Sequence, residues 1–550
     1  MGKRLATPER AIVALTLGVL VVVLVVIPIG RLAAVAWTEG HGILSYLAAE
    51  PGLGRAVINT ILLAAAVTLA AVPMGIAAAL GLARADVPGR RAWRLALLLP
   101  VVVPDYVLGF SWTQAYGIGG FTDVLADRPW SGVNSAVGVW AALTVGAVPL
   151  TYLVIAVGLA VRAEPSLVRA ARASGAGPAV VLWTVTLPLL RPAIAAATVL
   201  CFALSLGAFA IPQVMGSPGG FRTVTTEIYR SLSLGSDPQS FVAAVVLALL
   251  LVLITVLIVG PADAWLGPRM RVRRAAVVEP AVTVRTRSVA GVAVAVALGG
   301  FLLFGVLLPL IALLGTAVTP AVGVPPTPGN WTGDNFASVI TDRTIAALGR
   351  TALLAVTAAV LLTGLGAAVA GLEHRQGGRL IATLVTTTLV LPGSALAVAL
   401  LISYGRWLAD TLVLILLAYL AKLWAFGHRP LSGALDRLPP GELQAARASG
   451  AGAITAVRTV ALRPLAPALL TAWLIVCVTA MHEVTMSSLL YGPGTETLAV
   501  VVLNSADLGQ VQNTAALAVL VTLVVLVPAL PVWLLVRRLQ VRAPESVDAR

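Results

Sequence analysis

Long runs of apolar residues, separated by short polar breaks, recur along the whole chain. The first run, at 11–30, reads AIVALTLGVLVVVLVVIPIG and contains no charged residue. About 20 apolar residues in a helix span the roughly 30 Å hydrocarbon core of a bilayer. Because the runs are long and do not alternate between apolar and polar positions, they predict membrane-spanning helices rather than barrel strands.

The pattern predicts about twelve spans in two sets of six. The first set lies at about 11–36, 56–83, 95–116, 136–161, 192–213 and 241–262. The second set lies at about 288–316, 345–371, 380–403, 409–427, 466–489 and 514–536. We therefore expect an all-α integral membrane protein with two six-helix halves, at 1–262 and 288–550, joined by a basic cytoplasmic linker at 263–287.

The first apolar run has a second interpretation, as a cleaved signal peptide. Lys3, Arg4 and Arg10 precede it, and Ala34-Val35-Ala36 supplies the small residues of a cleavage site. Its apolar core is longer than the ~7–15 residues usual in a signal peptide. For this reason we favour a retained first span.

Composition agrees with a membrane protein and argues against other classes. Hydrophobic residues make up 59% of the chain and charged residues 11%, against about 45–50% and 25% in soluble proteins. The net charge of +14 comes from arginines scattered through short loops, so we expect a lipid bilayer and no nucleic acid as partner. Cys201 and Cys477 lie within apolar runs and are expected to be buried free thiols.

The Lys and Arg residues favour one orientation in the membrane. If the N-terminus lies inside, the inner segments hold 28 of the 37 Lys and Arg residues. Cytoplasmic loops of membrane proteins are enriched in these two residue types. We therefore expect both termini in the cytoplasm.

One heptapeptide occurs twice. ARASGAG occupies 171–177 and returns at 446–452, while LLLP at 97–100 is echoed by LVLP at 389–392. The two heptapeptides fall in predicted cytoplasmic loops at 162–191 and 428–465. Each loop predicts a short Ala- and Arg-rich helix, a glycine elbow and an apolar stretch that leads into the next span. Because small alanines allow close approach of another protein, we expect two docking surfaces. A duplicated helix bundle is typical of transporters.

Each loop resembles the EAA loop of binding-protein-dependent ABC importer permeases. That pattern is Glu-Ala-Ala, three residues, Gly, and about ten residues later a hydrophobic residue, any residue, Leu and Pro. Both copies lack the acidic residue, and the second also lacks the final proline. The resemblance implies the type I importer permease fold and loops that act as coupling helices. The docking residues that it implies are Arg169, Ala170, Ala171, Arg172, Gly175, Gly177, Gln444, Ala445, Ala446, Arg447, Gly450 and Gly452.

Two such loops on one chain resemble the fused ferric-iron and thiamine permeases. The stretches 202–240 and 481–510 favour the iron group, so the cargo implied is ferric iron, with thiamine, polyamines and phosphonates as alternatives. The resemblance also implies a bacterial inner membrane and two copies of an ABC ATPase subunit on the cytoplasmic side. It further implies an extracytoplasmic binding protein, which would meet outer loops such as 221–240 and 491–510.

The chain itself lacks the signature of an ATPase. A Walker A loop ends in Gly-Lys-Ser/Thr, and neither of the two lysines, Lys3 and Lys422, stands in such a motif. We expect ATP and Mg²⁺ to be bound by the partner subunit, with no cofactor, metal or catalytic residue on this chain.

Four ionisable residues within the predicted spans are candidates for the translocation pathway: Asp105, Lys422, His482 and Glu483. A charge within a span costs about 2.5–3.5 kcal/mol on insertion scales and usually faces the bundle interior or a water-filled path. Alternatives are that Lys422 extends to the membrane surface, that Asp105 lies near a membrane face, and that Glu483 only forms interior hydrogen bonds. His482 and Glu483 are neighbours and point about 100° apart on a helix, so they cannot both ligate one ion.

Two other function classes remain as alternatives. An ion-coupled secondary transporter also contains repeats, but it predicts carboxylates in both halves. The spacing between the two heptapeptides relates Glu483 to Ala208, which has no carboxylate. A membrane scaffold would leave the duplicated loop unexplained.

Overall fold

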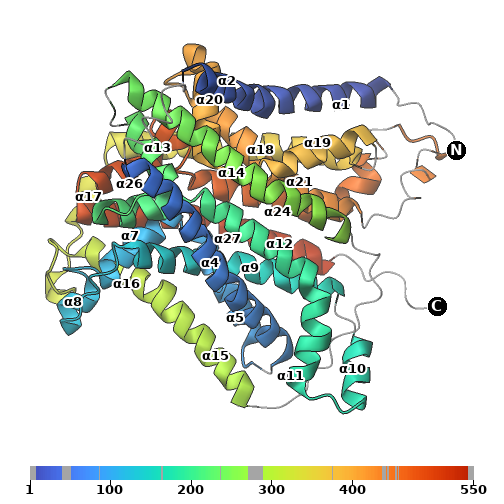
Figure 1. The fold of residues 1–550 in the computed structure, drawn as a ribbon, viewed down its shortest axis with the longest axis horizontal. Helices are drawn as coiled ribbons and strands as arrows, with labels where there is room; N and C mark the ends of the chain where they lie inside the picture. Colours follow the sequence, from blue (N-terminus) through green and yellow to red (C-terminus); the bar gives the residue numbers. More distant parts are fainter. Residues whose placement is uncertain are drawn as a thin grey trace.

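The structure is a computed structural model. It describes residues 8–39, 51–85, 87–162, 165–233, 235, 237–270, 289–373, 376–436, 441, 445–446, 448–452, 455 and 457–542. Within these ranges the chain forms α-helices, short π- and 3₁₀-helical segments and turns, with no β-strand. Figure 1 shows both chain ends on the right of the molecule, where the helices of the two halves diverge.

We call residues 8–270 the first half. Its elements are α1 (Pro8–Val21), η1 (Val22–Val26), α2 (Ile27–Glu39), α4 (Pro51–Arg84), α5 (Arg90–Ala96), α6 (Leu99–Val102), α7 (Asp105–Tyr116), α8 (Phe121–Ala126), α9 (Ala136–Arg162), α10 (Pro165–Ala173), α11 (Pro178–Val181), η3 (Leu182–Thr186), α12 (Leu187–Leu206), η4 (Pro212–Gly216), η5 (Ser217–Gly219), α13 (Val224–Ser233) and α14 (Pro238–Met270). The beginning of the predicted linker, at 263–270, therefore continues α14, and 271–287 lie outside the described residues.

Residues 289–542 form the second half. Its elements are α15 (Val289–Leu302), η6 (Leu303–Leu307), α16 (Leu308–Val318), η7 (Pro328–Asn330), α17 (Asp334–Val339), α18 (Asp342–Leu372), α19 (Gln376–Thr387), α20 (Gly393–Leu408), α21 (Leu412–Leu435), η8 (Val457–Ala461), α24 (Leu462–Met481), α25 (Ser487–Leu490), α26 (Leu498–Asp507) and α27 (Val511–Arg542).

Ten helices within the described residues are long and apolar enough to span a membrane, and they match ten of the twelve predicted spans. The predicted spans at 95–116 and 380–403 are instead broken. In the first, Arg90–Val102 and Asp105–Ala126 meet at 98°; in the second, α19 and α20 are separated by 388–392. The predicted count of twelve continuous spans is corrected accordingly.

A proline stands at the end of each break. Pro104 and Pro392 immediately precede α7 and α20, with ψ angles of 140° and 133°. Proline cannot donate a backbone hydrogen bond, and it disfavours the helical conformation in the residue before it. The structural counterpart of LVLP at 389–392 is thus VVVP at 101–104, not LLLP at 97–100.

The two halves exchange their first spans. Helices α1 and α2 pack against α19 and α20, while α15 and α16 pack against α4 and α7; Figure 1 shows α1 and α2 lying along α19 and α20 at the upper edge. Each first span contains a π-helical segment, η1 or η6, just before a proline-bearing helix. A π turn shifts the helical hydrogen-bond pattern, and here some of its carbonyl groups accept bonds from the other half.

Two tyrosines make these bonds in an equivalent way. Tyr404 on α20 donates to the carbonyl oxygen of Val23 in η1 at 2.6 Å. Tyr116 on α7 donates to the carbonyl oxygen of Phe304 in η6, and Trp112 Nε1 donates to the next carbonyl, Gly305 O, at 2.9 Å. We call the Tyr404–Val23 and Tyr116–Phe304 pairs the tyrosine clasps. Each joins one half to the first span of the other.

A second duplicated contact fixes the short helices α13 and α26. Thr60 on α4 accepts the backbone N–H of Val224 at 2.9 Å, and Thr351 on α18 accepts that of Leu498 at 2.8 Å. The first N–H groups of a helix have no partner within the helix, so each threonine satisfies one of them. Internal duplication therefore extends beyond the heptapeptide to single equivalent residues such as Thr60 and Thr351.

Candidate functional site

The first elbow follows α10. Gly175 adopts φ of +84°, a left-handed conformation that glycine adopts at little cost. Its N–H donates to Arg172 O at 3.0 Å, and the N–H of Ala176 donates to Ala171 O at 3.0 Å. This pair of bonds is the Schellman motif, which ends a helix with a left-handed residue. Gly175, the first glycine of the repeated heptapeptide, is therefore favoured by the left-handed conformation of this turn.

The second elbow has the same geometry. Gly450 also has φ of +84°, and the N–H of Ala451 donates to Ala446 O at 3.1 Å. Ser449 Oγ bonds Ala445 O at 3.0 Å, as Ser174 Oγ bonds Ala170 O at 3.0 Å. The predicted docking residues Gln444 and Arg447 lie outside the described residues.

Both elbows are accessible, with the same pattern of exposure. Ala171 and Ala446 are half-buried, and the other described docking residues are exposed: Arg169, Ala170, Arg172, Gly175, Gly177, Ala445, Gly450 and Gly452. A Cβ atom added to any of these four glycines meets no atom within 4 Å. Figure 1 shows α10 and α11 projecting at the lower right. Another protein can therefore reach them.

A side-chain bond connects the first elbow to the bundle. Arg84, the last residue of α4, donates from Nη2 to Thr186 Oγ1 at 2.5 Å. Thr186 ends η3, which joins α11 to α12 without interruption. The first elbow is therefore connected to both α4 and α12.

At the centre of the molecule, Lys422 fills the break in the second half. Its Nζ donates to Leu389 O at 2.8 Å and to Leu391 O. These carbonyls lie between α19 and α20, where the helical N–H donors are missing. Lys422 also interacts electrostatically with Glu483. The ammonium is thus engaged inside the bundle and does not extend to a membrane surface.

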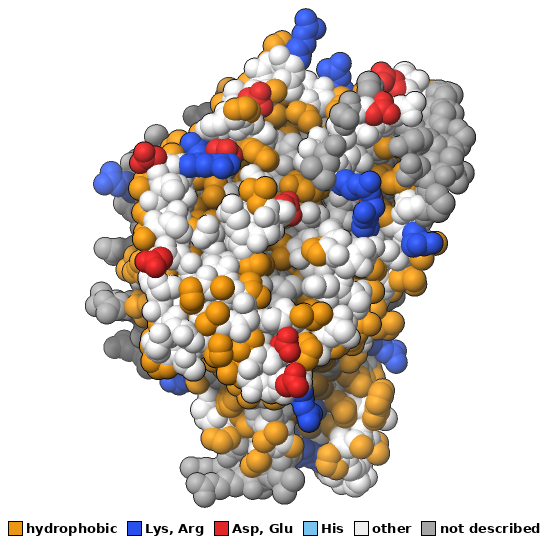
Figure 2. All heavy atoms as spheres, turned by 90° about the vertical axis from the view of Figure 1, so that its left-hand side faces the viewer, with side chains coloured by type: hydrophobic (Ala, Val, Ile, Leu, Met, Phe, Trp, Pro, Cys, Tyr) orange, Lys and Arg blue, Asp and Glu red, His pale blue; other side chains and the backbone are white. Residues whose placement is uncertain are grey.

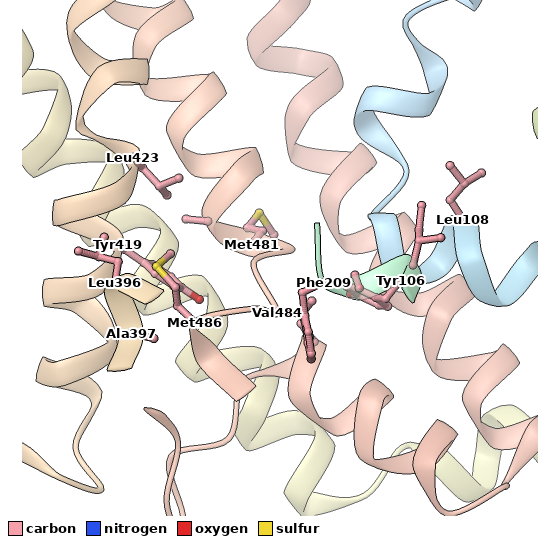
Figure 3. Packing of buried hydrophobic residues seen from close by; sticks show 14 of the residues in the cluster. Tyr106, Leu108, Phe209, Leu396, Ala397, Tyr419, Leu423, Met481, Val484 and Met486 are labelled. Carbon is pink, nitrogen blue, oxygen red and sulfur yellow. The ribbon is translucent and has the colours of Figure 1, made fainter. Parts of the chain in front are cut away.

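Glu483 caps the next short helix. Its carboxylate accepts the N–H of Met486 at 2.9 Å and of Ser487 at 3.1 Å, as well as Ser487 Oγ at 3.2 Å. Ser487 Oγ also lies 2.8 Å from Tyr419 Oη on α21. Figure 3 shows Tyr419 and Met486 close together on one side of the centre. Glu483 therefore forms the interior hydrogen bonds that the sequence left as an alternative.

Asp105 differs from these engaged groups. It is the first residue of α7, directly after the break. Its side chain is exposed, while Pro104 and Tyr106 are buried. Among the described residues, none forms a hydrogen bond or ion pair with Asp105.

Tyr106 and His482 also carry unsatisfied polar atoms. Tyr106 is 2% exposed, and no described residue bonds its hydroxyl. His482 is half-buried, and its Nδ1 has no partner among the described residues. Sequence analysis did not identify Tyr106, Tyr419 or Ser487, because single hydroxyl groups in apolar runs are common in membrane helices. Within the described residues, no group of three or more His, Cys, Asp and Glu side chains could hold a metal.

The regions expected to meet an extracytoplasmic partner are buried in part. Val224–Tyr229 of α13 and Leu498–Leu503 of α26 are buried, because both helices are anchored beneath the surface by Thr60 and Thr351. Figure 2 shows the face opposite the chain ends, where single acidic and basic side chains stand among uncharged ones. Residues 507–510 and several residues of 230–239 are exposed, so contact of these loops with an extracytoplasmic protein stays a prediction.

Comparisons with known proteins agree with an internal duplication. The family described as "Binding-protein-dependent transport system inner membrane component" matches the chain twice, at residues 71–272 and 361–543. The molybdenum transport system permease protein ModB of Mycobacterium tuberculosis is 37% identical over 217 residues, which cover 39% of this chain and 80% of the relative.

Two relatives match most of the chain. The ferric transport system permease protein FbpB of Actinobacillus pleuropneumoniae is 24% identical over 492 residues, covering 83% of this chain and 67% of the relative. The probable ABC transporter permease protein y4fN of Sinorhizobium fredii is 24% identical over 527 residues, covering 91% of this chain and 90% of the relative.

Proposed function

The chain belongs to the family of binding-protein-dependent transport system inner membrane components, and we propose that its two elbows dock two copies of a separate ABC ATPase subunit. In this proposal the chain is the complete membrane pathway of an ATP-driven importer. ATP and Mg²⁺ are bound by the ATPase copies, and an extracytoplasmic protein delivers the cargo.

The equivalence of the elbows supports docking most directly. They share φ of +84° at Gly175 and Gly450, the backbone bonds of Ala176 and Ala451, and the exposure of their described residues. A surface turn that only connects two helices does not require an identical heptapeptide. Two copies of one partner do require it, because each copy presents the same groove.

Movement of the ATPase copies would then switch the pathway. ATP-driven closure brings the elbows together, and the Arg84–Thr186 bond passes the motion to α4 and α12. The halves rock between inward-open and outward-open states, which is a rigid-body change biased by a partner. Asp105 and His482 border the pathway, while Lys422 and Glu483 hold the backbone that shapes it.

We propose ferric iron as the cargo and the bacterial inner membrane as the location, with both termini and both elbows in the cytoplasm. The ferric permease FbpB aligns with 83% of this chain, whereas the ModB relative aligns with 39% of it. Molybdate is the competing cargo, because the ModB alignment has the higher identity. Thiamine, polyamines and phosphonates remain alternatives.

Docking is tested with a charge on each elbow. Ala171→Glu and Ala446→Glu place a carboxylate on the half-buried alanine of each loop, and Ala321→Glu at an exposed site away from the elbows is the control. An unpaired charge in an interface costs several kcal/mol, so we expect about tenfold or greater loss of ATPase co-purification and of ATP-dependent uptake for both elbow variants. Normal co-purification of both with membrane-inserted protein would refute docking.

A further inference from the structure

The short helices α13 and α26 occupy equivalent places in the two halves but end in different residues. Each is ten residues long and is anchored at its first residue by a threonine, so Ser233 ends α13 where Asp507 ends α26. Figure 1 shows both helices on the left, away from the elbow that α10 and α11 form at the lower right. Of these two equivalent positions, the one in the second half carries a carboxylate.

Asp507 accepts hydrogen bonds from two elements of the other half. Gln213 in η4 donates from Nε2 to Asp507 Oδ1 at 3.4 Å, and the Tyr229 hydroxyl on α13 donates to Asp507 Oδ2 at 3.2 Å. Helix α26 also packs against η4. Each carboxylate oxygen thus has its own donor from the first half, and we call this pair of bonds the Asp507 latch.

The first half holds both donors of the latch in place. Ser217 Oγ donates to Gln213 Oε1 at 3.1 Å, which leaves the amide nitrogen of Gln213 to point toward Asp507. Tyr229 is 6% exposed, and its ring packs on that of Phe209 with the centroids 5.2 Å apart. Figure 3 shows Phe209 among the buried residues at the centre of the molecule. Tyr229 therefore connects the latch with the central packing.

Other side-chain hydrogen bonds between the halves involve the exchanged first spans. The tyrosine clasps join α20 to η1 and α7 to η6, and Thr316 on α16 donates to Gln114 on α7 at 3.4 Å. Each first span packs against the half to which it is bonded, so these bonds stay within one moving body. The two bonds to Asp507 join elements that are not exchanged. Movement of one body against the other therefore breaks the latch.

We propose that the Asp507 latch holds the pathway closed at the end opposite the elbows until the ATPase copies close. This inference rests on the proposed function and deepens it by assigning residues that resist opening. In a rigid-body rocking motion, approach of the elbows at one end separates the halves at the other. The latch therefore stabilises the state in which the elbows are apart, and its loss shifts the population toward the state that hydrolyses ATP.

ATP hydrolysis in the absence of a binding protein tests the latch for any cargo. The permease–ATPase complex is reconstituted in proteoliposomes, and phosphate release is measured for Asp507→Ala, Tyr229→Phe and Gln213→Ala. We expect about a tenfold rise in Asp507→Ala, which loses two hydrogen bonds to a charged group, and about a threefold rise in each of the others. Adding Tyr229→Phe to Asp507→Ala should have no further effect, because the hydroxyl has already lost its acceptor.

Asp334→Ala is the matched control, because it removes an exposed carboxylate from α17 on the same side of the molecule in Figure 1. It should leave hydrolysis unchanged. A general loss of stability lowers hydrolysis, so a rise separates release of the latch from misfolding. Unchanged hydrolysis in both Asp507→Ala and Tyr229→Phe, in complexes that contain the ATPase, would overturn the latch while the importer function stands. Failure of the unmodified protein to bind the ATPase refutes the proposed function instead.

Cross-linking measures the separation directly. Gln213→Cys and Asp507→Cys are combined, and a short, reducible bifunctional thiol reagent is added; the native Cys201 and Cys477 are buried. We expect cross-linking of the nucleotide-free complex, loss of ATP hydrolysis in the cross-linked protein and recovery on reduction. After trapping with ATP and vanadate, cross-linking should be largely lost. Equal cross-linking before and after trapping would overturn the proposal, because the two halves then do not separate at Asp507.

Discussion

The elbows and the centre of the molecule show opposite outcomes of one duplication. At the elbows, the two copies keep the same heptapeptide, the same glycine φ angle and an equivalent backbone bond that ends the helix. At the centre, Asp105 and Ala208 in the first half correspond to Gly393 and Glu483 in the second. In the proposed assembly each elbow meets its own copy of one ATPase, whereas both halves share a single cargo. Two copies of one ATPase favour identical elbows, whereas a single cargo pathway does not require identical residues in the two halves.

The tyrosine clasps lie between these extremes. Their hydroxyl-to-carbonyl pairing is duplicated, but Trp112 adds a second bond to η6 on one side. The equivalent position on α20 is Leu400, which cannot donate a hydrogen bond. The pairing of a tyrosine hydroxyl with a π-helix carbonyl is thus the same on both sides, while the number of hydrogen bonds differs.

The largest expected effect is at the centre, where Lys422→Met removes an ammonium that the first half does not have. This leaves the carbonyls of Leu389 and Leu391 without their donor, and an unsatisfied buried polar group costs about 1–3 kcal/mol, so we expect a clear fall in the melting temperature of the detergent-solubilised protein. Lys422→Met combined with Glu483→Gln should recover part of this loss. Equal stability of Lys422→Met and the original protein would mean that the centre is not held by this ammonium.

A smaller effect is expected at the elbows, and it should be the same on both sides. Gly175→Val and Gly450→Val force a side chain into a left-handed conformation, which costs about 1–2 kcal/mol. Each should weaken coupling of ATP hydrolysis to uptake by about tenfold, because about 1.4 kcal/mol is a factor of ten. Gly177→Ala, at φ of −67°, is the control. A defect in one half alone would contradict the equivalence of the elbows.

The smallest effects concern the clasps. Tyr404→Phe and Tyr116→Phe each delete one hydroxyl, with a net loss of about 0.5–1.5 kcal/mol. We expect Tyr404→Phe to destabilise more, since Trp112 continues to hold η6 when Tyr116 is changed. Thermal unfolding of the two variants side by side measures the difference; the reverse order would show that Trp112 does not support its clasp.

Ten of the about twelve predicted spans and both elbows agree with the structure, because long apolar runs and an identical heptapeptide are local signals. Pro104 before Asp105 indicates a broken helix in the first half, but the break at 388–392 was not predicted, since proline alone does not determine a break. Pro73, Pro149 and Pro430 also lie within apolar runs, yet α4, α9 and α21 continue through them. The break at Pro392 coincides with carbonyl groups that Lys422 satisfies from another helix, and no local pattern shows such a contact.

The roles of Asp105, Lys422 and Glu483 also could not be predicted by comparing the two halves along the sequence. The separation between equivalent positions is not constant, because Asp105 and Gly393 lie further apart in the sequence than Gly175 and Gly450 do. A uniform shift by the heptapeptide spacing pairs Asp105 with Leu380, far from the second break. Insertions in the loops change the offset between equivalent spans. The equivalent positions of charged residues can therefore be identified only from the structure.

The exchange of first spans bears on how the protein is assembled. Helices α1 and α2 complete a surface of the second half, and α15 and α16 complete a surface of the first. Either half produced alone would therefore lack the first span of the other half, which covers part of its surface. Cutting the chain between α14 and α15 should leave two pieces that purify together, because each packs against the first span of the other without needing the covalent link.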